Sequence, residues 1–200
     1  MTLPLFPLGT VLFPGGLLGL KVFEARYLDL IGRCLREGGS FGVVALREGS
    51  EVHRSGGEAV ALERCGVIAG LLDVDVAQPG IMQVRCRGLQ RFELQSSRQQ
   101  DDGLWLGEIS LIEDDAAVPP GEALAGSVRG LAEAIEALRG QGALPFLEPF
   151  RFDDAGWVAN RWCELLPITL EAKQQLMRLG DPLVRLQLVD EYLRDKGVVS

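Results

Sequence analysis

At 200 residues, with 47% hydrophobic side chains, the chain is long enough to bury the core of one large domain or two small ones. Its formal net charge of −8 argues against a nucleic-acid partner, because nucleic-acid binders use a basic surface to replace phosphate counterions. The four cysteines are far apart in sequence, and the single histidine has no second histidine with which to share a metal. We therefore expect reduced, mostly buried thiols, no metal site and a cytoplasmic location.

The chain opens with an apolar stretch that carries no charged side chain before Lys21. Such a stretch has the composition of a signal peptide or a membrane anchor, but Pro4, Pro7 and Pro14 interrupt any helix through it, and no basic region precedes it. No other apolar segment approaches the length of a membrane-spanning helix. The stretch is therefore predicted to form buried strand and turn, in a protein without a membrane partner.

The rest of the first part is predicted to be strand-rich, with one helix over Glu24–Glu37. In that helix Leu28, Ile31 and Leu35 recur at helical spacing, and Gly38-Gly39 ends it. Short apolar or alternating runs predict strands at Phe41–Arg47, Gly66–Val76, Met82–Arg87, Arg91–Gln95 and around Trp105–Leu111.

Alternation in these strands predicts one buried and one solvent-exposed face. Arg85, Arg87 and Arg91 are expected on the exposed face. The turn Asp101-Asp102-Gly103 predicts a hairpin between the last two strands.

A domain boundary is predicted where Asp114-Asp115 and Pro119-Pro120-Gly121 interrupt the pattern. We expect a β-rich domain over residues 1–115 and a helical bundle over residues 116–200, with Asp114-Asp115 as linker residues. Helices are predicted over Leu124–Leu138, after Asp153-Asp154, from Thr169 and after Asp181-Pro182. Strands first and helices afterwards indicate an α+β fold with a groove between the two parts.

No catalytic motif is recognisable in the sequence. None of the lysines directly follows a glycine, so no Walker-type nucleotide site is expected. His53 lies in a polar stretch and no Gly-x-Ser-x-Gly motif occurs, which favours an exposed loop histidine. Asp73 and Asp75 are expected at a solvated strand end, because hard metals need more oxygen ligands than two acids supply. We therefore expect no enzyme activity and no cofactor, although a hydrolase whose residues meet only in space stays open.

The segment Leu3–Tyr27 closely resembles the start of the Lon N-terminal domain family. Its motifs PLFPL, VLFPG and VFEARY match the family pattern in order and spacing. Shorter matches follow at Phe41-Gly42-Val43, Gly88-x-x-Arg91-Phe92, Leu165-Leu166-Pro167 and Arg185-Leu186. The resemblance implies a PUA-like β-rich pseudo-barrel followed by a helical bundle, without the ATPase and protease domains of a full Lon protease.

The resemblance also implies a non-enzymatic polypeptide-recognition module, an accessory in protein quality control. Its implied partners are unfolded or apolar polypeptide segments and a Lon-type protease, while the oligomeric state stays open. The peptide-binding candidates are Phe23, Glu24, Arg26, Tyr27, Arg91 and Phe92. Architectural roles are open for the same residues, because Glu24 suits a helix N-terminus and Arg26 has acidic neighbours. A small-molecule sensor or carrier that uses the groove between the two parts is the alternative function.

Overall fold

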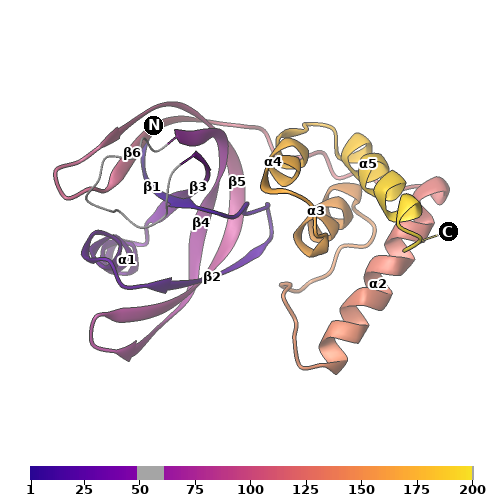
Figure 1. Cartoon of the computed structure of the whole chain (residues 1–200), viewed down its shortest axis with the longest axis horizontal. Helices are drawn as coiled ribbons and strands as arrows, with labels where there is room; N and C mark the ends of the chain where they lie inside the picture. Colours follow the sequence, from indigo (N-terminus) through magenta and orange to yellow (C-terminus); the bar gives the residue numbers. More distant parts are fainter. Residues whose placement is uncertain (49–60, 200) are drawn as a thin grey trace. The chain divides into compact units, whose positions relative to one another are not determined.

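The computed structural model describes residues 1–48 and 61–199, and the predicted loop histidine, His53, lies outside them. The chain divides into two compact units, Met1–Glu113 and Asp114–Ser200, which are drawn in Figure 1 and are described here one at a time. The first unit is strand-rich and the second is helical, so the predicted α+β fold is confirmed.

In its described residues, the first unit is a six-stranded sheet with one helix. Its elements are β1 (Thr2–Leu8), β2 (Leu17–Val22), α1 (Ala25–Glu37), β3 (Ser40–Glu48), β4 (Ala61–Gln78), β5 (Ile81–Gln99) and β6 (Trp105–Leu111). The strand order is β2-β5-β4-β3-β1-β6, and β5 also pairs with β6, so that the sheet closes on itself. β1 and β3 are parallel and the other pairs are antiparallel. β2 is bonded to β5 and lies at the end of this order, outside the closed part.

Apolar side chains from five strands fill the interior of this unit, and Phe92 is at the centre, with no exposed surface. Its ring packs over Gly42 and Gly66, where a side chain would collide with it: a Cβ at Gly66 would lie 2.4 Å from the ring atom Cζ. The cluster consists of Leu3, Leu5, Val44, Ile68, Phe92, Leu94 and Ile109.

Helix α1 buries a different face from the one predicted. Its buried residues are Tyr27, Leu30, Ile31 and Cys34, whereas Leu35 is 54% exposed. Two apolar sets, one residue apart, have helical spacing in this segment. The ring of Tyr27 stacks on Phe6 of β1, with centroids 3.9 Å apart, and this contact determines which set turns inward.

The second unit holds a short 3-10 turn and four helices. They are η1 (Glu122–Leu124), α2 (Ala125–Gly140), α3 (Ala155–Leu165), α4 (Leu170–Arg178) and α5 (Pro182–Asp195). Three helices begin as predicted, because the side chains of Asp154, Thr169 and Asp181 accept hydrogen bonds from the first free backbone N–H groups. Residues 155–163 of α3 are all buried, so this helix is the core of the unit.

A buried arginine joins several segments of the helical unit. The guanidinium of Arg185 in α5 is 1% exposed and donates to the Asp115 carboxylate at 2.6 Å and to Asn160 Oδ1 at 3.1 Å. It also donates to the carbonyl oxygens of Leu176, at 2.9 Å, and Leu179. The assignment of Asp115 as a linker residue was therefore wrong, because its carboxylate balances a buried charge.

Candidate functional site

The first unit contains a cleft of about 300 Å³, which we call the β2 cleft. It lies among β1, β2 and the start of α1. The lining residues are Phe6, Leu8, Thr10, Leu18, Gly19, Leu20, Lys21, Val22, Phe23, Glu24 and Tyr27. Most of these side chains are apolar, and Thr10, Lys21, Glu24 and the hydroxyl of Tyr27 supply polar groups.

The β2 cleft follows the edge of β2 rather than one of its faces. Every residue from Leu18 to Glu24 lines it. Side chains alternate between the two faces of a strand, so an unbroken run of lining residues means that the strand presents its edge. Phe6 and Leu8 of β1 and Tyr27 of α1 form the apolar wall beside it.

Three of the predicted peptide-binding residues meet in the β2 cleft. Phe23 directly follows β2 and is 54% exposed, which is unusual for a large aromatic side chain. Glu24 precedes α1 and Tyr27 lies in its first turn. This part of the candidate site could be predicted because the residues are close in sequence.

Arg26 lies behind these residues and connects them to the β5–β6 turn. Its Nη2 donates to Glu24 Oε2 at 2.7 Å and its Nη1 donates to the carbonyl oxygen of Gly103 at 2.7 Å. Its guanidinium also lies 4.7 Å from the ring centroid of Tyr27. Its side chain is only 8% exposed, and these contacts tie Glu24 and Tyr27 to the β5–β6 turn.

The other two candidates do not reach the β2 cleft. Phe92 is in the core, and Arg91 is 3% exposed. Arg91 was expected on the solvent-exposed face beside Arg85 and Arg87, which are indeed exposed. The expectation was wrong for Arg91 because the segment after β6 covers it: Arg91 Nη2 donates to the carbonyl of Glu113 at 3.3 Å, and its own carbonyl accepts from the amide of Ile112.

Sequence reasoning missed the apolar wall of the cleft. Phe6 and Leu8 were read only as buried strand, and Leu18 and Leu20 only as part of the apolar opening stretch. The available signal was Lys21, the first charge after that stretch and an exposed residue. A charged residue inside an apolar strand often marks an exposed sheet edge.

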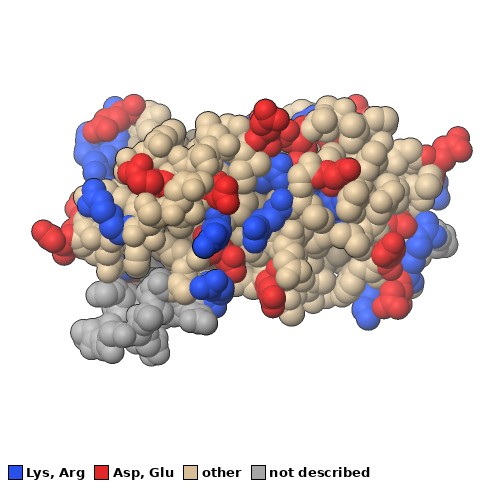
Figure 2. Space-filling model, turned by 90° about the horizontal axis from the view of Figure 1, so that it is seen from above, with Lys and Arg blue, Asp and Glu red and all other residues tan. Residues whose placement is uncertain are grey.

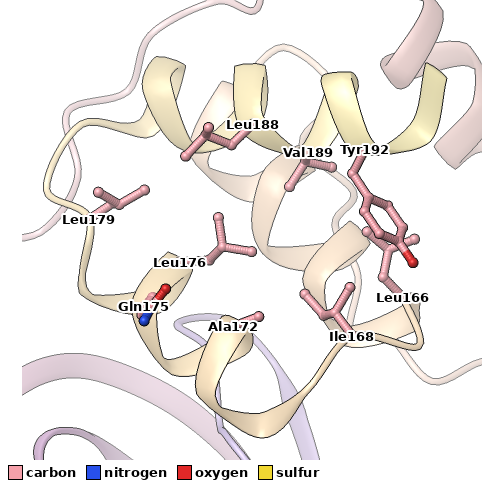
Figure 3. Close-up of a pocket in the computed structure, with 9 residues that line it drawn as sticks. All are labelled: Leu166, Ile168, Ala172, Gln175, Leu176, Leu179, Leu188, Val189 and Tyr192. Atoms are coloured by element: carbon pink, nitrogen blue, oxygen red, sulfur yellow. The ribbon is translucent and has the colours of Figure 1, made fainter. Parts of the chain in front are cut away.

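The helical unit contains a second pocket, of about 340 Å³, which we call the helical pocket (Figure 3). α4 and α5 supply most of its walls, and the segments after α3 and α4 complete it. Its lining residues are Leu166, Ile168, Ala172, Gln175, Leu176, Leu179, Leu188, Val189 and Tyr192. Gln175 and Tyr192 are the residues of this set with polar side-chain groups, so the pocket suits apolar groups.

Metal ions and activated cysteine thiolates are two common catalytic groups. Among residues 1–48 and 61–199, no group of three or more His, Cys, Asp or Glu side chains could hold a metal ion. All four cysteines are free and buried, as expected. Burial raises the pKa of the Cys86 and Cys163 thiols to about 12, which disfavours the nucleophilic thiolate.

Acidic and basic side chains are interspersed among uncharged ones on the face of the molecule in Figure 2. Of the helices in the described part of the chain, none combines the length and the apolar character needed to cross a membrane.

Comparisons of the chain with known proteins agree on one family. The family model described as "ATP-dependent protease La (LON) substrate-binding domain" matches residues 2–195. A "Lon protease" from Anaeromyxobacter dehalogenans (strain 2CP-C) is 28% identical over 198 residues. The match covers 97% of this chain and 23% of that protein, so the chain spans about a quarter of the length of this curated relative.

Solved structures agree with this match. A Lon N-terminal domain protein from Xanthomonas campestris is 36% identical, with a TM-score of 0.68, covering 94% of this chain and 96% of that one. The N-terminal domain of a Mycobacterium avium complex Lon protease has the same fold, with a TM-score of 0.64 at 16% identity, covering 98% of this chain and 99% of that one. The chain belongs to the LON substrate-binding domain family.

Proposed function

We propose that the chain is a non-enzymatic module that recognises unfolded or apolar polypeptide segments in protein quality control, and that the β2 cleft contacts them. The observation that carries this proposal is the exposed ring of Phe23 beside an apolar cleft that Tyr27 and Glu24 also line. Membership of a substrate-binding domain family supports the same reading.

The physical basis of recognition is the removal of apolar surface from water. The ring of Phe23 is half exposed in the free chain, and a substrate side chain that enters the cleft would cover it together with the partly exposed Leu18. Arg26 neutralises Glu24 through the 2.7 Å ion pair, so the cleft does not present an unbalanced negative charge to an apolar segment.

The expected setting is the cytoplasm, and the expected partner is a Lon-type protease that degrades the bound polypeptides. Similarity to about a quarter of a much longer Lon protease supports this pairing. Binding is expected to be independent of ATP, since the cleft itself performs the recognition.

A pair of matched variants tests the proposal. Phe23 and Leu35 are both 54% exposed in the same unit, but only Phe23 lines the β2 cleft. Phe23→Ser is expected to weaken binding of an unfolded, fluorescently labelled polypeptide about tenfold, and Leu35→Ser less than about twofold, as fluorescence anisotropy would show. Equal binding by both variants and the parent chain, or no binding by the parent chain across a broad peptide array, contradicts the proposal.

Arg26→Ala separates positioning from contact. Because this change removes the hydrogen bonds to Glu24 and Gly103, it is expected to lower the thermal stability of the chain. Unchanged stability together with lost peptide binding would instead make Arg26 a contact residue.

A small-molecule sensor or carrier is the second candidate function, and the helical pocket favours it. This pocket is lined mostly by apolar side chains of α4 and α5 and has a size suited to a small apolar ligand (Figure 3). A ligand that copurifies with the chain in native mass spectrometry, and is lost when the pocket is filled by Ala172→Trp, would support this function over peptide binding.

A further inference from the structure

We propose that the polypeptide substrate binds in the β2 cleft as an added β-strand, hydrogen-bonded to the free edge of β2. We further propose that the preferred segment alternates apolar residues with acidic ones. The inference rests on the proposed function only in taking a polypeptide as the occupant. It adds the conformation of that polypeptide and the residue pattern that the edge selects.

The first step is that β2 has a free edge. β2 pairs with β5 on one side, while β5 and β6 close the rest of the sheet. Within residues 1–48 and 61–199, no strand pairs with the other side of β2. The unpaired N–H and C=O groups of an edge strand are a template for another strand, and several protein families bind extended peptides in this way.

The register shows which backbone groups are available. The amide of Gly88 donates to the carbonyl of Gly16 at 2.9 Å, directly before β2 begins. Bonded and non-bonded pairs alternate in an antiparallel ladder, and the β2–β5 register runs without a shift from Leu17 to Val22. Leu17, Gly19 and Lys21 therefore direct their N–H and C=O groups away from β5, which is enough to hold a strand of about six residues.

The second step concerns the side chains of the added strand that turn inward. They would meet the apolar wall formed by Phe6, Leu8 and Tyr27, which lines the cleft beside the β2 edge. The cleft volume of about 300 Å³ is suited to large apolar side chains. The inward positions of the substrate are therefore expected to be apolar.

The third step concerns the side chains that turn outward. On the exposed face, Gly19 has no side chain and Lys21 is exposed. In the next strand, Arg87 lies opposite Leu17 and Arg85 lies opposite Gly19, and both arginines are exposed.

Lys21, Arg85 and Arg87 form a basic group on this face. The group contrasts with the chain as a whole, which has a net charge of −8. The exposed acids Asp73 and Asp75 lie one strand further away, on β4, on the side of β5 remote from the free edge. An acidic side chain on the added strand would thus have Lys21 as its nearest charged neighbour across the ladder, and such opposite-charge pairs stabilise strand pairing.

An extended polypeptide satisfies all three features together. A helix satisfies its own backbone groups and offers none to the β2 edge. A small apolar ligand would fill the cleft but would leave the outward N–H and C=O groups of β2 to water. A second copy of this chain paired through β2 is the competing occupant, and the experiments below detect it.

The direct test uses peptides of alternating valine and glutamate with N-methyl groups on every second amide. An N-methyl group removes one donor and blocks strand pairing on that side only. Methylation of one alternate set is expected to weaken binding about tenfold or more, and methylation of the other set less than about threefold. If binding weakens only when the glutamate amides are methylated, the peptide lies antiparallel to β2. If binding weakens only when the valine amides are methylated, the peptide lies parallel to β2. Equal effects of the two sets overturn strand addition.

Variants of β2 test the same inference from the protein side. A Cβ at Gly19 meets no atom within 4 Å, so Gly19→Ala is a matched control that keeps the outward N–H. Gly19→Pro removes that N–H without removing a bond to β5 and is expected to weaken peptide binding about tenfold, whereas Gly19→Ala is not. Lys21→Glu is expected to reverse the preference between valine–glutamate and valine–lysine peptides. Unchanged preference contradicts the charge argument.

Failure of the proposed function and failure of strand addition give different results. If the parent chain binds no polypeptide, the proposed function itself fails. If it binds unfolded polypeptides but ignores N-methylation and Gly19→Pro, recognition stands and strand addition is wrong. A concentration-dependent dimer in sedimentation that Gly19→Pro abolishes, together with the absence of peptide binding, would assign the edge to a second copy and overturn the inference.

Discussion

Replacing Arg185 with methionine is expected to lower the free energy of unfolding of the helical unit by about 3–5 kcal/mol. The guanidinium is 1% exposed and balances the Asp115 carboxylate at 2.6 Å. Methionine fills much of the same space but removes the buried positive charge that balances this carboxylate. The carbonyl oxygens of Leu176 and Leu179 also lose their donor. Urea denaturation followed by circular dichroism measures the change.

Arg139→Ala is the matched control for this measurement. Arg139 lies in the same unit and forms ion pairs with Glu136 at 2.9 Å and Glu148 at 3.2 Å, but its side chain is 45% exposed. Water screens such surface pairs, so the control is expected to cost less than about 1 kcal/mol. Similar losses for the two variants would show that Arg185 is not the buried hub of the helical unit.

Replacing Gly88 with alanine is expected to destabilise the first unit by about 3 kcal/mol, through overpacking against fixed backbone. A Cβ at Gly88 would lie 2.1 Å from the carbonyl oxygen of Phe13, far inside van der Waals contact. The Phe13 turn cannot move away freely, because Gly88 exchanges backbone hydrogen bonds with Gly15 and Gly16 at 2.8 and 2.9 Å. This attachment sets the start of β2, so the variant is also expected to weaken peptide binding.

The control for Gly88 is Gly19→Ala, since a Cβ at Gly19 meets no atom within 4 Å. Its stability is expected to stay within about 0.5 kcal/mol of the parent chain, as for a surface substitution that meets no neighbour. Thermal unfolding of both variants, followed by near-ultraviolet circular dichroism, compares them. If the Gly88→Ala chain is as stable as the parent chain, the turn before β2 adapts to the added methyl group. The predicted overpacking against the Phe13 carbonyl would then be wrong.

Local signals explain what the sequence predicted correctly. The helix starts at Asp154, Thr169 and Asp181 depend on a side chain that bonds to backbone only two or three residues ahead, and such patterns are readable without a fold. The proximity of Phe23, Glu24 and Tyr27 could be predicted for the same reason. These residues follow one another across a single strand-to-helix junction.

Contacts between distant segments explain what the sequence did not predict. Asp115 looks like a linker residue until helix α5 brings Arg185 to it, 70 positions later. Arg91 alternates in sequence with apolar residues, which is the pattern of an exposed strand position. The segment after β6 nevertheless covers it. The burial of Tyr27 rather than Leu35 depends on Phe6 in β1, a contact that helical periodicity alone does not contain.

The free edge of β2 is the feature that joins fold and function. It exists because the sheet closes through β5 and β6 and leaves β2 outside the closed part. A closed sheet removes the hazard of exposed edges, so a free edge next to an apolar cleft is well suited to accept an extended partner. The core cluster around Phe92 contains no residue of β2.

The most direct test of this account is residue-resolved hydrogen exchange of the chain alone and saturated with an unfolded polypeptide. The account predicts slower exchange at the outward amides of Leu17, Gly19 and Lys21. Little change is predicted at Leu18 and Leu20, whose amides face β5. Protection that appears only around the helical pocket, with unchanged exchange along β2, would contradict the assignment of the β2 cleft as the recognition site.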